Sequence, residues 1–257
     1  MEEKVIKKLE KINGDVSFYY KNLISKEIIK YNDEKQMLAA SIIKLPILIE
    51  CFNQINKGII SNDDIFITKN KEKVPSCGAL NYMRENLKVT LEDLYTLMII
   101  LSDNYATNML IDKLGIYNIN KTINEIGLKN TILNRKMFDE EKSLLGLENY
   151  TSARDMAYLL EKMYNKELID EKSSEEMISI LKNQRLNGKI PFFIQSIRPK
   201  VQIAHKTGED TNITHDVGIV FAKEPFIVCF CGNNVNVPEY ERLMQDITYE
   251  LYKDITY

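Results

Sequence analysis

The hydrophobic pattern at the two ends of the chain predicts strands and helices that share one sheet. Apolar residues in 1–12 recur at helical spacing, which predicts an amphipathic helix. Two β-rich runs follow at 16–23 and 26–32, and their close succession predicts a hairpin. Strict alternation returns after residue 200. It predicts strands over 201–208, 216–222 and 226–231, then a helix that starts just after Pro238.

The middle of the chain has the periodicity of helices. Residues 42–52 are apolar on nearly every side, which predicts a helix buried all round. Thr90 and Asp93 form a capping-box pattern at the start of a second helix. Further helical patterns cover 106–114, 117–126, 152–164 and 173–183. Residues 130–150 have no clear period and predict a long surface loop, a kind of segment that often carries function.

Strands at both ends with helices between them indicate a discontinuous domain. We predict an α/β fold in which residues 1–38 and 199–257 form a five-stranded antiparallel sheet flanked by the terminal helices. Residues 39–198 are predicted to form an all-helical inserted domain. The cleft between the two domains is the expected place for a site.

Composition narrows the function classes. The chain has 257 residues with 34 basic and 37 acidic side chains, a net charge of −3, and 44% hydrophobic residues. Charges of both signs are mixed along it, without the basic footprint of a nucleic-acid binder. No apolar run is long enough to span a bilayer, and the N-terminus lacks the apolar region of a secretory signal. We expect a monomer in the cytoplasm with no nucleic-acid or membrane partner.

The four cysteines, Cys51, Cys77, Cys229 and Cys231, form no C-x-x-C pair and no Cys/His set with metal spacing. We therefore expect reduced, structural thiols and neither a metal nor another cofactor. Cys229 and Cys231 alternate within a predicted strand, so both should point inward from one face.

One short motif combines a nucleophile with a base. Ser41 and Lys44 are three residues apart at the start of the buried helix, so the lysine can reach the serine hydroxyl. A hydroxyl at a helix N-terminus also lies near free backbone N–H groups that can stabilise an oxyanion. The same spacing recurs at Ser179 and Lys182, within an exposed helical pattern where we expect only a structural role.

Two other motifs could supply partners. Ser102-Asp103-Asn104 interrupts two helices, where polar side chains can be held over a cleft, although Asp and Asn are also common caps. Lys206-Thr207-Gly208 lies on a predicted strand. Its Gly admits a ligand close to the backbone, and its Lys and hydroxyl suit a carboxylate.

In this order, S-x-x-K, S-D-N and K-T-G resemble the motif set of class A β-lactamases and penicillin-binding proteins. The separations of 61 and 104 residues between the motifs and the order of predicted elements are similar too. The resemblance covers almost the whole chain and implies a β-lactamase/transpeptidase-like fold. By this resemblance Ser41 is the acylated nucleophile, Lys44 activates it, and Ser102 relays a proton to the leaving nitrogen.

The resemblance also implies a substrate-binding set. Asn104 would bind the substrate amide, while Lys206 and Thr207 would hold its carboxylate beside Gly208. The backbone N–H groups of Ser41 and Glu209 would form the oxyanion hole. The acidic Glu209 is a departure, because a small residue is usual there, and it should disfavour some anionic substrates.

The loop shows a second departure from class A enzymes. Their deacylating Glu lies two residues after an Arg, and the matching position after Arg135 is Met137. Asp139, Glu140 and Glu141 follow closely. One of them could act as the base from a shifted position, or the three could simply form a solvated acidic loop. The resemblance therefore implies acylation followed by slow deacylation.

His205, His215 and Asp216 suggest a Ser-His-Asp triad, but the sequence has no G-x-S-x-G elbow and an S-x-x-K serine needs no His. We expect Asp216 to orient Lys206 or its neighbours instead. Three functions stay open: a β-lactam hydrolase, a peptidase or esterase with a peptide-like substrate, and a penicillin-binding sensor that stays acylated.

Overall fold

The computed structural model describes residues 1–75, 77–198 and 200–256. The main helices are α1 (Glu2–Leu9), α2 (Lys44–Asn56), α3 (Leu91–Ile100), α4 (Asn104–Leu114), α5 (Ile116–Ile126), α6 (Glu140–Leu144), α7 (Ala153–Tyr164), α8 (Glu171–Lys182) and α9 (Val237–Asp254). The long strands are β1 (Asp15–Asn22), β2 (Ile28–Tyr31), β7 (Gln202–Asp210), β8 (Ile213–Phe221) and β9 (Phe226–Asn233). In this part of the chain, no helix is long and apolar enough to cross a membrane.

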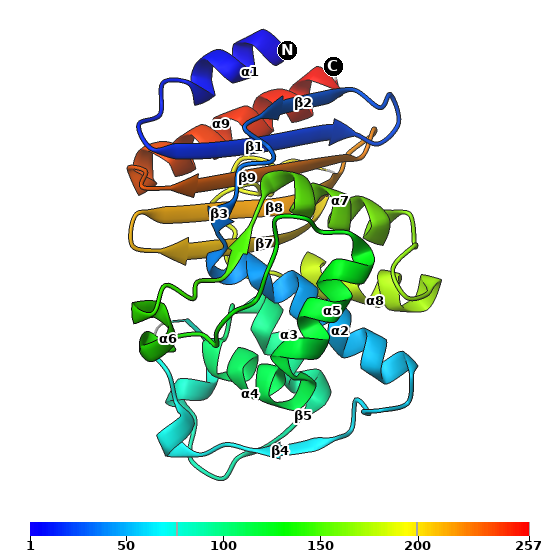
Figure 1. Cartoon of the computed structure of the whole chain (residues 1–257). Helices are drawn as coiled ribbons and strands as arrows, with labels where there is room; N and C mark the ends of the chain where they lie inside the picture. The colour runs from blue at the N-terminus through cyan, green and yellow to red at the C-terminus, as the bar shows by residue number, and fades with distance from the viewer. Residues whose placement is uncertain (76, 199, 257) are drawn as a thin grey trace.

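The five long strands form one sheet in the order β2-β1-β9-β8-β7. All its pairings are antiparallel, and β1 lies against β9, so the two ends of the chain meet in the middle of the sheet. Figure 1 shows α1 and α9 together beside this sheet, with both termini at the same end of the molecule. The predicted α/β fold with a five-stranded antiparallel sheet is therefore confirmed.

The two faces of the sheet belong to different cores because side chains alternate along each strand. On β9, Cys229 and Cys231 are buried among residues of the helices α2 to α8. Val228, which precedes Cys229, and Phe230, which lies between the two cysteines, pack instead with residues of α1 and α9. The two cysteines thus point inward from one face, as their spacing predicts.

The inserted region is not all-helical, which corrects the sequence prediction. Two short strands, β4 (Ile65–Ile67) and β5 (Lys88–Thr90), pair with each other, and β3 (Met37–Leu38) pairs with β6 (Tyr150–Thr151). Strands this short have too few residues to show an alternating pattern. The β3–β6 pair joins the end of the 130–150 loop to the segment just before Ser41.

Two further details differ from the sequence prediction. The 130–150 segment contains a short helix, α6, whose N-cap is Asp139. Ile190 and Ile194 pack on the α1 and α9 side of the sheet, although the sequence assigns them to the helical insert. The capping box at Thr90 and Asp93 is formed as predicted, with both side chains bonded to the opposite backbone N–H.

Candidate active site

Ser41 lies in a 3₁₀ turn, Ala40–Ile43, and Lys44 is the first residue of α2. Residues three apart nearly eclipse in such a turn, so their side chains leave the backbone on the same side. The Lys44 Nζ atom is 3.0 Å from the Ser41 Oγ atom. The predicted contact between the two side chains is therefore present.

Lys44 is fully buried, and its Nζ atom has four oxygen neighbours. Besides Ser41, they are the Ser102 carbonyl oxygen at 2.7 Å, the Ser102 Oγ at 3.1 Å and the Asn104 Oδ1 at 2.8 Å. Burial, followed by the positive charge of Lys206, holds the pKa of Lys44 well below its usual range. Both effects favour the neutral amine.

The neutral amine fits these neighbours. It has two N–H donors and one lone pair, and two of the neighbours, the Ser102 carbonyl and the Asn104 amide oxygen, can only accept. Donation to those two oxygens leaves the lone pair for a hydroxyl, on Ser41 or Ser102. Lys44 is thereby arranged to accept a proton from the serine in the cleft.

A strained break between α3 and α4 presents Ser102. Its φ angle is 54°, in the left-handed region, so the chain reverses sharply at this residue. The buried Asp103 carboxylate fixes the break: it accepts hydrogen bonds from the backbone N–H of Ala106 at 2.9 Å, of Ala79 at 2.7 Å and of Leu80 at 2.9 Å. Asp103 thus caps the N-terminus of α4 and also binds the 79–80 segment to it. Its neighbours Ser102 and Asn104 both hydrogen-bond to Lys44.

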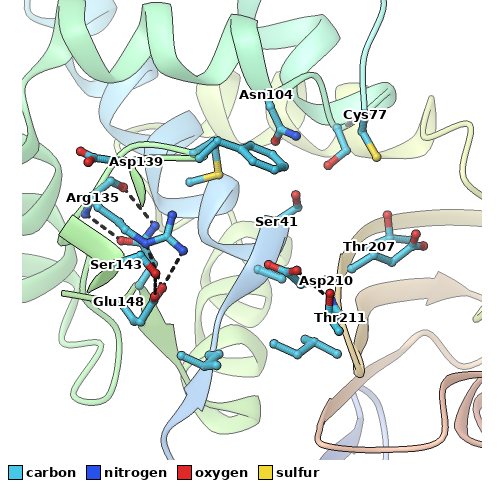
Figure 2. A pocket seen from close by; sticks show the side chains of 18 of the residues that line it. Ser41, Cys77, Asn104, Arg135, Asp139, Ser143, Glu148, Thr207, Asp210 and Thr211 are labelled. Carbon is cyan, nitrogen blue, oxygen red and sulfur yellow. Dashed lines mark hydrogen bonds and ion pairs between the residues drawn. The ribbon is translucent and has the colours of Figure 1, made fainter. Parts of the chain in front are cut away.

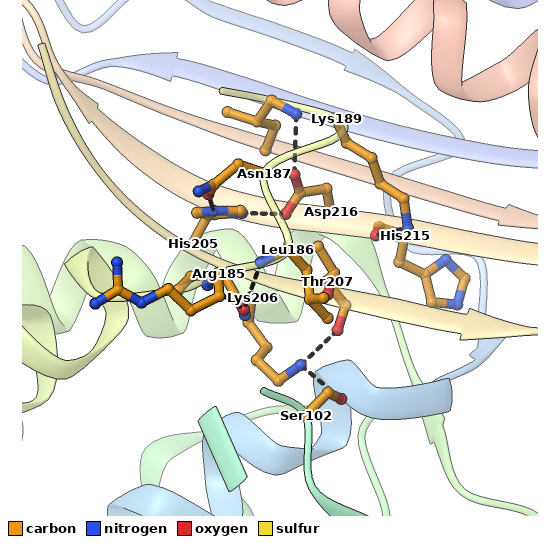
Figure 3. A network of polar contacts seen from close by, with 12 residues as sticks. Ser102, Arg185, Leu186, Asn187, Lys189, His205, Lys206, Thr207, His215 and Asp216 are labelled. Carbon is orange, nitrogen blue, oxygen red and sulfur yellow. Dashed lines mark hydrogen bonds and ion pairs between the residues drawn. The ribbon is translucent and has the colours of Figure 1, made fainter. Parts of the chain in front are cut away.

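Lys206 approaches the same hydroxyl from β7. Its Nζ atom lies 3.0 Å from the Ser102 Oγ and donates to the Thr207 carbonyl at 2.7 Å (Figure 3). Burial lowers the pKa of Lys206 to about 7, against the opposing effect of the Asp216 carboxylate. The Ser102 hydroxyl therefore lies between two buried amines and can pass a proton between them or to a bound molecule.

The two histidines are held away from any triad. His205 Nδ1 lies 2.9 Å from Asp216 Oδ1, and its Nε2 lies 3.0 Å from Asn187 Oδ1. His215 Nε2 contacts the Leu38 carbonyl at 2.8 Å, and burial lowers its pKa to about 4. Asp216 holds His205, the neighbour of Lys206, as expected from the sequence (Figure 3).

These groups open onto a cleft of about 410 Å³ between the helical region and the end of β7 (Figure 2). The lining residues include Ser41, Cys77, Ser102, Asn104, Arg135, Met137, Phe138, Asp139, Glu140, Ser143, Glu148, Asn149, Thr207, Glu209, Asp210 and Thr211. Five of the eight predicted site residues line the cleft: Ser41, Ser102, Asn104, Thr207 and Glu209. The buried Lys44 and Lys206 reach it through hydrogen bonds to lining residues, so seven of the eight are at the cleft. Gly208 lies between Thr207 and Glu209, which both line the cleft. A Cβ atom added at Gly208 would lie only 3.0 Å from the His215 side chain, so the backbone is closely packed there.

Met137, the residue at the position where the sequence resemblance leads us to expect a carboxylate, forms part of the cleft wall. The Asn108 side chain holds its backbone at both ends, with Oδ1 2.8 Å from the Met137 N–H and Nδ2 2.9 Å from the Met137 carbonyl. Asp139 and Glu140 also line the cleft, while Glu141 is not among its lining residues. The structure keeps Asp139 and Glu140 as candidate bases.

Sequence reasoning missed two ion-pair clusters at the cleft. Arg135 binds Glu148 through Nε at 2.8 Å and Nη2 at 2.6 Å, which ties the loop to itself. Lys189 lies buried beneath Glu209 and Glu241, at 2.8 Å and 3.4 Å. Neither pairing has a local signal, since the partners are far apart along a chain rich in charged residues.

A buried lysine that joins a cleft serine to a second hydroxyl, with a lysine from a neighbouring strand, is the arrangement of a serine enzyme of the S-x-x-K type. The chain belongs to the β-lactamase enzyme family, whose model matches residues 2–255. It is a β-lactamase-like serine hydrolase by family and fold.

Solved structures extend this assignment. A β-lactamase from Sphaerobacter thermophilus is 26% identical, with a TM-score of 0.89 over 96% of this chain and 94% of that one. PBP-A is also 26% identical, with a TM-score of 0.88 over 99% of this chain and 95% of that one, and a mutant of it is solved as an acyl-enzyme complex with penicillin G. A search of curated proteins by sequence gives no match.

Proposed function

We propose that this protein is a serine hydrolase that opens the β-lactam amide through an acyl-enzyme on Ser41 and releases the acyl group slowly. The observation that carries the proposal is the position of the buried Lys44 amine, 3.0 Å from Ser41 and 3.1 Å from the Ser102 hydroxyl. Its lowered pKa supports a base that is neutral before substrate binds.

In the proposed acylation, Ser41 Oγ attacks the amide carbon and its proton moves to Lys44. The backbone N–H groups of Ser41 and Glu209 would stabilise the oxyanion. The C–N bond then breaks, and the leaving nitrogen takes a proton from the Ser102 hydroxyl, which Lys44 or Lys206 restores.

Slow deacylation is proposed because the wall of the cleft carries Met137, a side chain that cannot accept a proton from water. Three carboxylates of this loop line the cleft, Asp139, Glu140 and Glu148, and Glu148 is held in an ion pair with Arg135 at 2.6 Å. Asp139 is engaged as the N-cap of α6, where it accepts from the Lys142 N–H at 3.2 Å, and Glu140 is exposed. Neither side chain has the enclosed position that would favour an efficient base.

Intact-mass measurements over time with penicillin G test this proposal. We expect a long-lived adduct of one penicillin mass that is absent in Ser41→Ala. Rapid release of hydrolysed penicillin, abolished by Asp139→Asn or Glu140→Gln but not by the control Glu141→Gln, would refute slow deacylation and identify the base. No adduct and no hydrolysis with penicillin would favour a peptidase or esterase.

The charge of Lys206 should shape the pH dependence of acylation. The positive charge of Lys206 disfavours protonation of Lys44, so Lys206→Gln should raise the pKa of Lys44. Less Lys44 is then neutral at a given pH, and the acid limb of the rate profile moves to higher pH. Acylation rates measured between about pH 5 and pH 9 check the shift, and an acid limb at unchanged pH would contradict it.

A further inference from the structure

We propose that the cleft selects acyl donors whose leaving group carries a positive charge and lies against the end of β7. This inference rests on the proposed acylation of Ser41 and adds the class of substrate.

The lining of the cleft is strongly acidic. Among the described residues that line it are five carboxylates and a single cationic side chain, Arg135. The carboxylates are Asp139, Glu140, Glu148, Glu209 and Asp210. Arg135 is bound by Glu148, so it offers little charge to a ligand. The lining therefore has a larger excess of negative charge than the whole chain, whose net charge is −3.

Lys189, a cation that contacts Glu209 near the end of β7, is already paired with carboxylates of the protein. The Lys189 side chain is 3% exposed and lies 2.8 Å from Glu209 and 3.4 Å from Glu241. It also donates to the His215 carbonyl at 3.3 Å (Figure 3). Two carboxylates face one ammonium, so this cluster keeps a negative charge, and the Glu209 side chain, 53% exposed, presents that charge to the cleft.

The second lysine of this side, Lys206, is also withdrawn. It is fully buried, is not among the lining residues, and already donates to Ser102 and to the Thr207 carbonyl. An anionic group that approaches Thr207 would meet the carboxylates of Glu209 and Asp210 on the same strand before any unpaired cation. An ammonium group there would instead gain two carboxylate partners.

A series of thioesters tests the inference, because thioesters need no carboxylate and can vary charge in the leaving group alone. Phenylacetylglycine thioesters of thiocholine, 2-mercaptoethanol and 3-mercaptopropionate carry a cationic, neutral and anionic leaving group. In each case Ser41 Oγ forms the new ester bond, the C–S bond breaks, and the serine proton leaves with the thiol. The thiol released and the mass of the adduct on Ser41 give the acylation rate.

Each rate is divided by the hydroxide-catalysed hydrolysis rate of the same thioester, which removes differences in leaving-group reactivity. We expect the thiocholine ester to exceed the 3-mercaptopropionate ester by about tenfold or more at low salt, and the difference to shrink at high salt. Glu209→Gln should abolish most of this preference and should also speed acylation by penicillin, whose carboxylate meets the same charges.

Glu241→Gln is the matched control, because it changes the other carboxylate on Lys189 at a position outside the lining residues, and it should keep the preference. Equal corrected rates for the three thioesters, or a preference that Glu209→Gln leaves unchanged, would overturn the charge selection while the acylation of Ser41 stands. If neither a thioester nor penicillin forms an adduct on Ser41, the proposed function fails together with this inference.

Discussion

Replacement of Lys44 by methionine is expected to slow the acylation of Ser41 by penicillin by roughly 10³-fold, within the usual range for loss of a general base. Among the residues that the structure describes, Lys44 is the basic side chain that hydrogen-bonds to Ser41, at 3.0 Å. Burial lowers its pKa and so favours the neutral amine. Methionine fills a similar volume but has no lone pair that can accept the serine proton. Stopped-flow measurement of adduct formation gives the effect directly.

The chain contains its own control for this experiment. Lys182 has the same S-x-x-K spacing from Ser179, but it donates to Gln202 at 2.8 Å and lies over the Phe221 ring. Lys182→Met should therefore leave the acylation rate within about twofold of the parent, as surface changes usually do. Thermal unfolding of both variants shows whether each is folded. A folded Lys44→Met variant with near-normal acylation would remove Lys44 as the base.

The contacts of the site that can be predicted from local sequence are those between residues close together in the chain. The contact between Ser41 and Lys44 follows from a three-residue spacing in any helical turn, and Asp103 is a natural cap. The sequence resemblance added Ser102 and Lys206, which lie 104 residues apart but share a hydrogen bond of 3.0 Å. That contact depends on the left-handed turn at Ser102 and on the position of β7, and neither has a periodic signal.

The parts that could not be predicted are pairings of charged residues across the fold. The resemblance marks Glu209 as an unusual neighbour of the K-T-G motif, yet its partner Lys189 lies in an irregular segment before β7. Glu241 comes from α9, whose helical pattern shows only that the residue is exposed or at a boundary. A charged side chain chooses its partner from the finished three-dimensional arrangement, so a pattern of hydrophobic positions cannot reveal it.

Substitution of Met137 by glutamate is expected to shorten the life of the penicillin adduct by about 10²-fold, the lower range for a general base. Asn108 binds both the N–H and the carbonyl of Met137, so the backbone should keep its place when the side chain changes. The new carboxylate would lie in the wall of the cleft that Ser41 also lines. There it could orient a water molecule and take its proton as the water attacks the ester.

Met137→Gln separates the charge of the new side chain from its shape. Glutamine has nearly the same size and can bind a water molecule, but it cannot accept its proton. We therefore expect the glutamate variant to release penicilloate in repeated turnovers, while the glutamine variant and the parent keep the adduct. The measurement is the decay of the adduct mass after excess penicillin is removed. Equal adduct lifetimes in all three proteins would show that something other than the missing base limits deacylation. Rapid decay in the parent would instead point to a base among the carboxylates that already line the cleft, and Asp139 and Glu140, which follow Met137 closely in the loop, are then the first to be replaced.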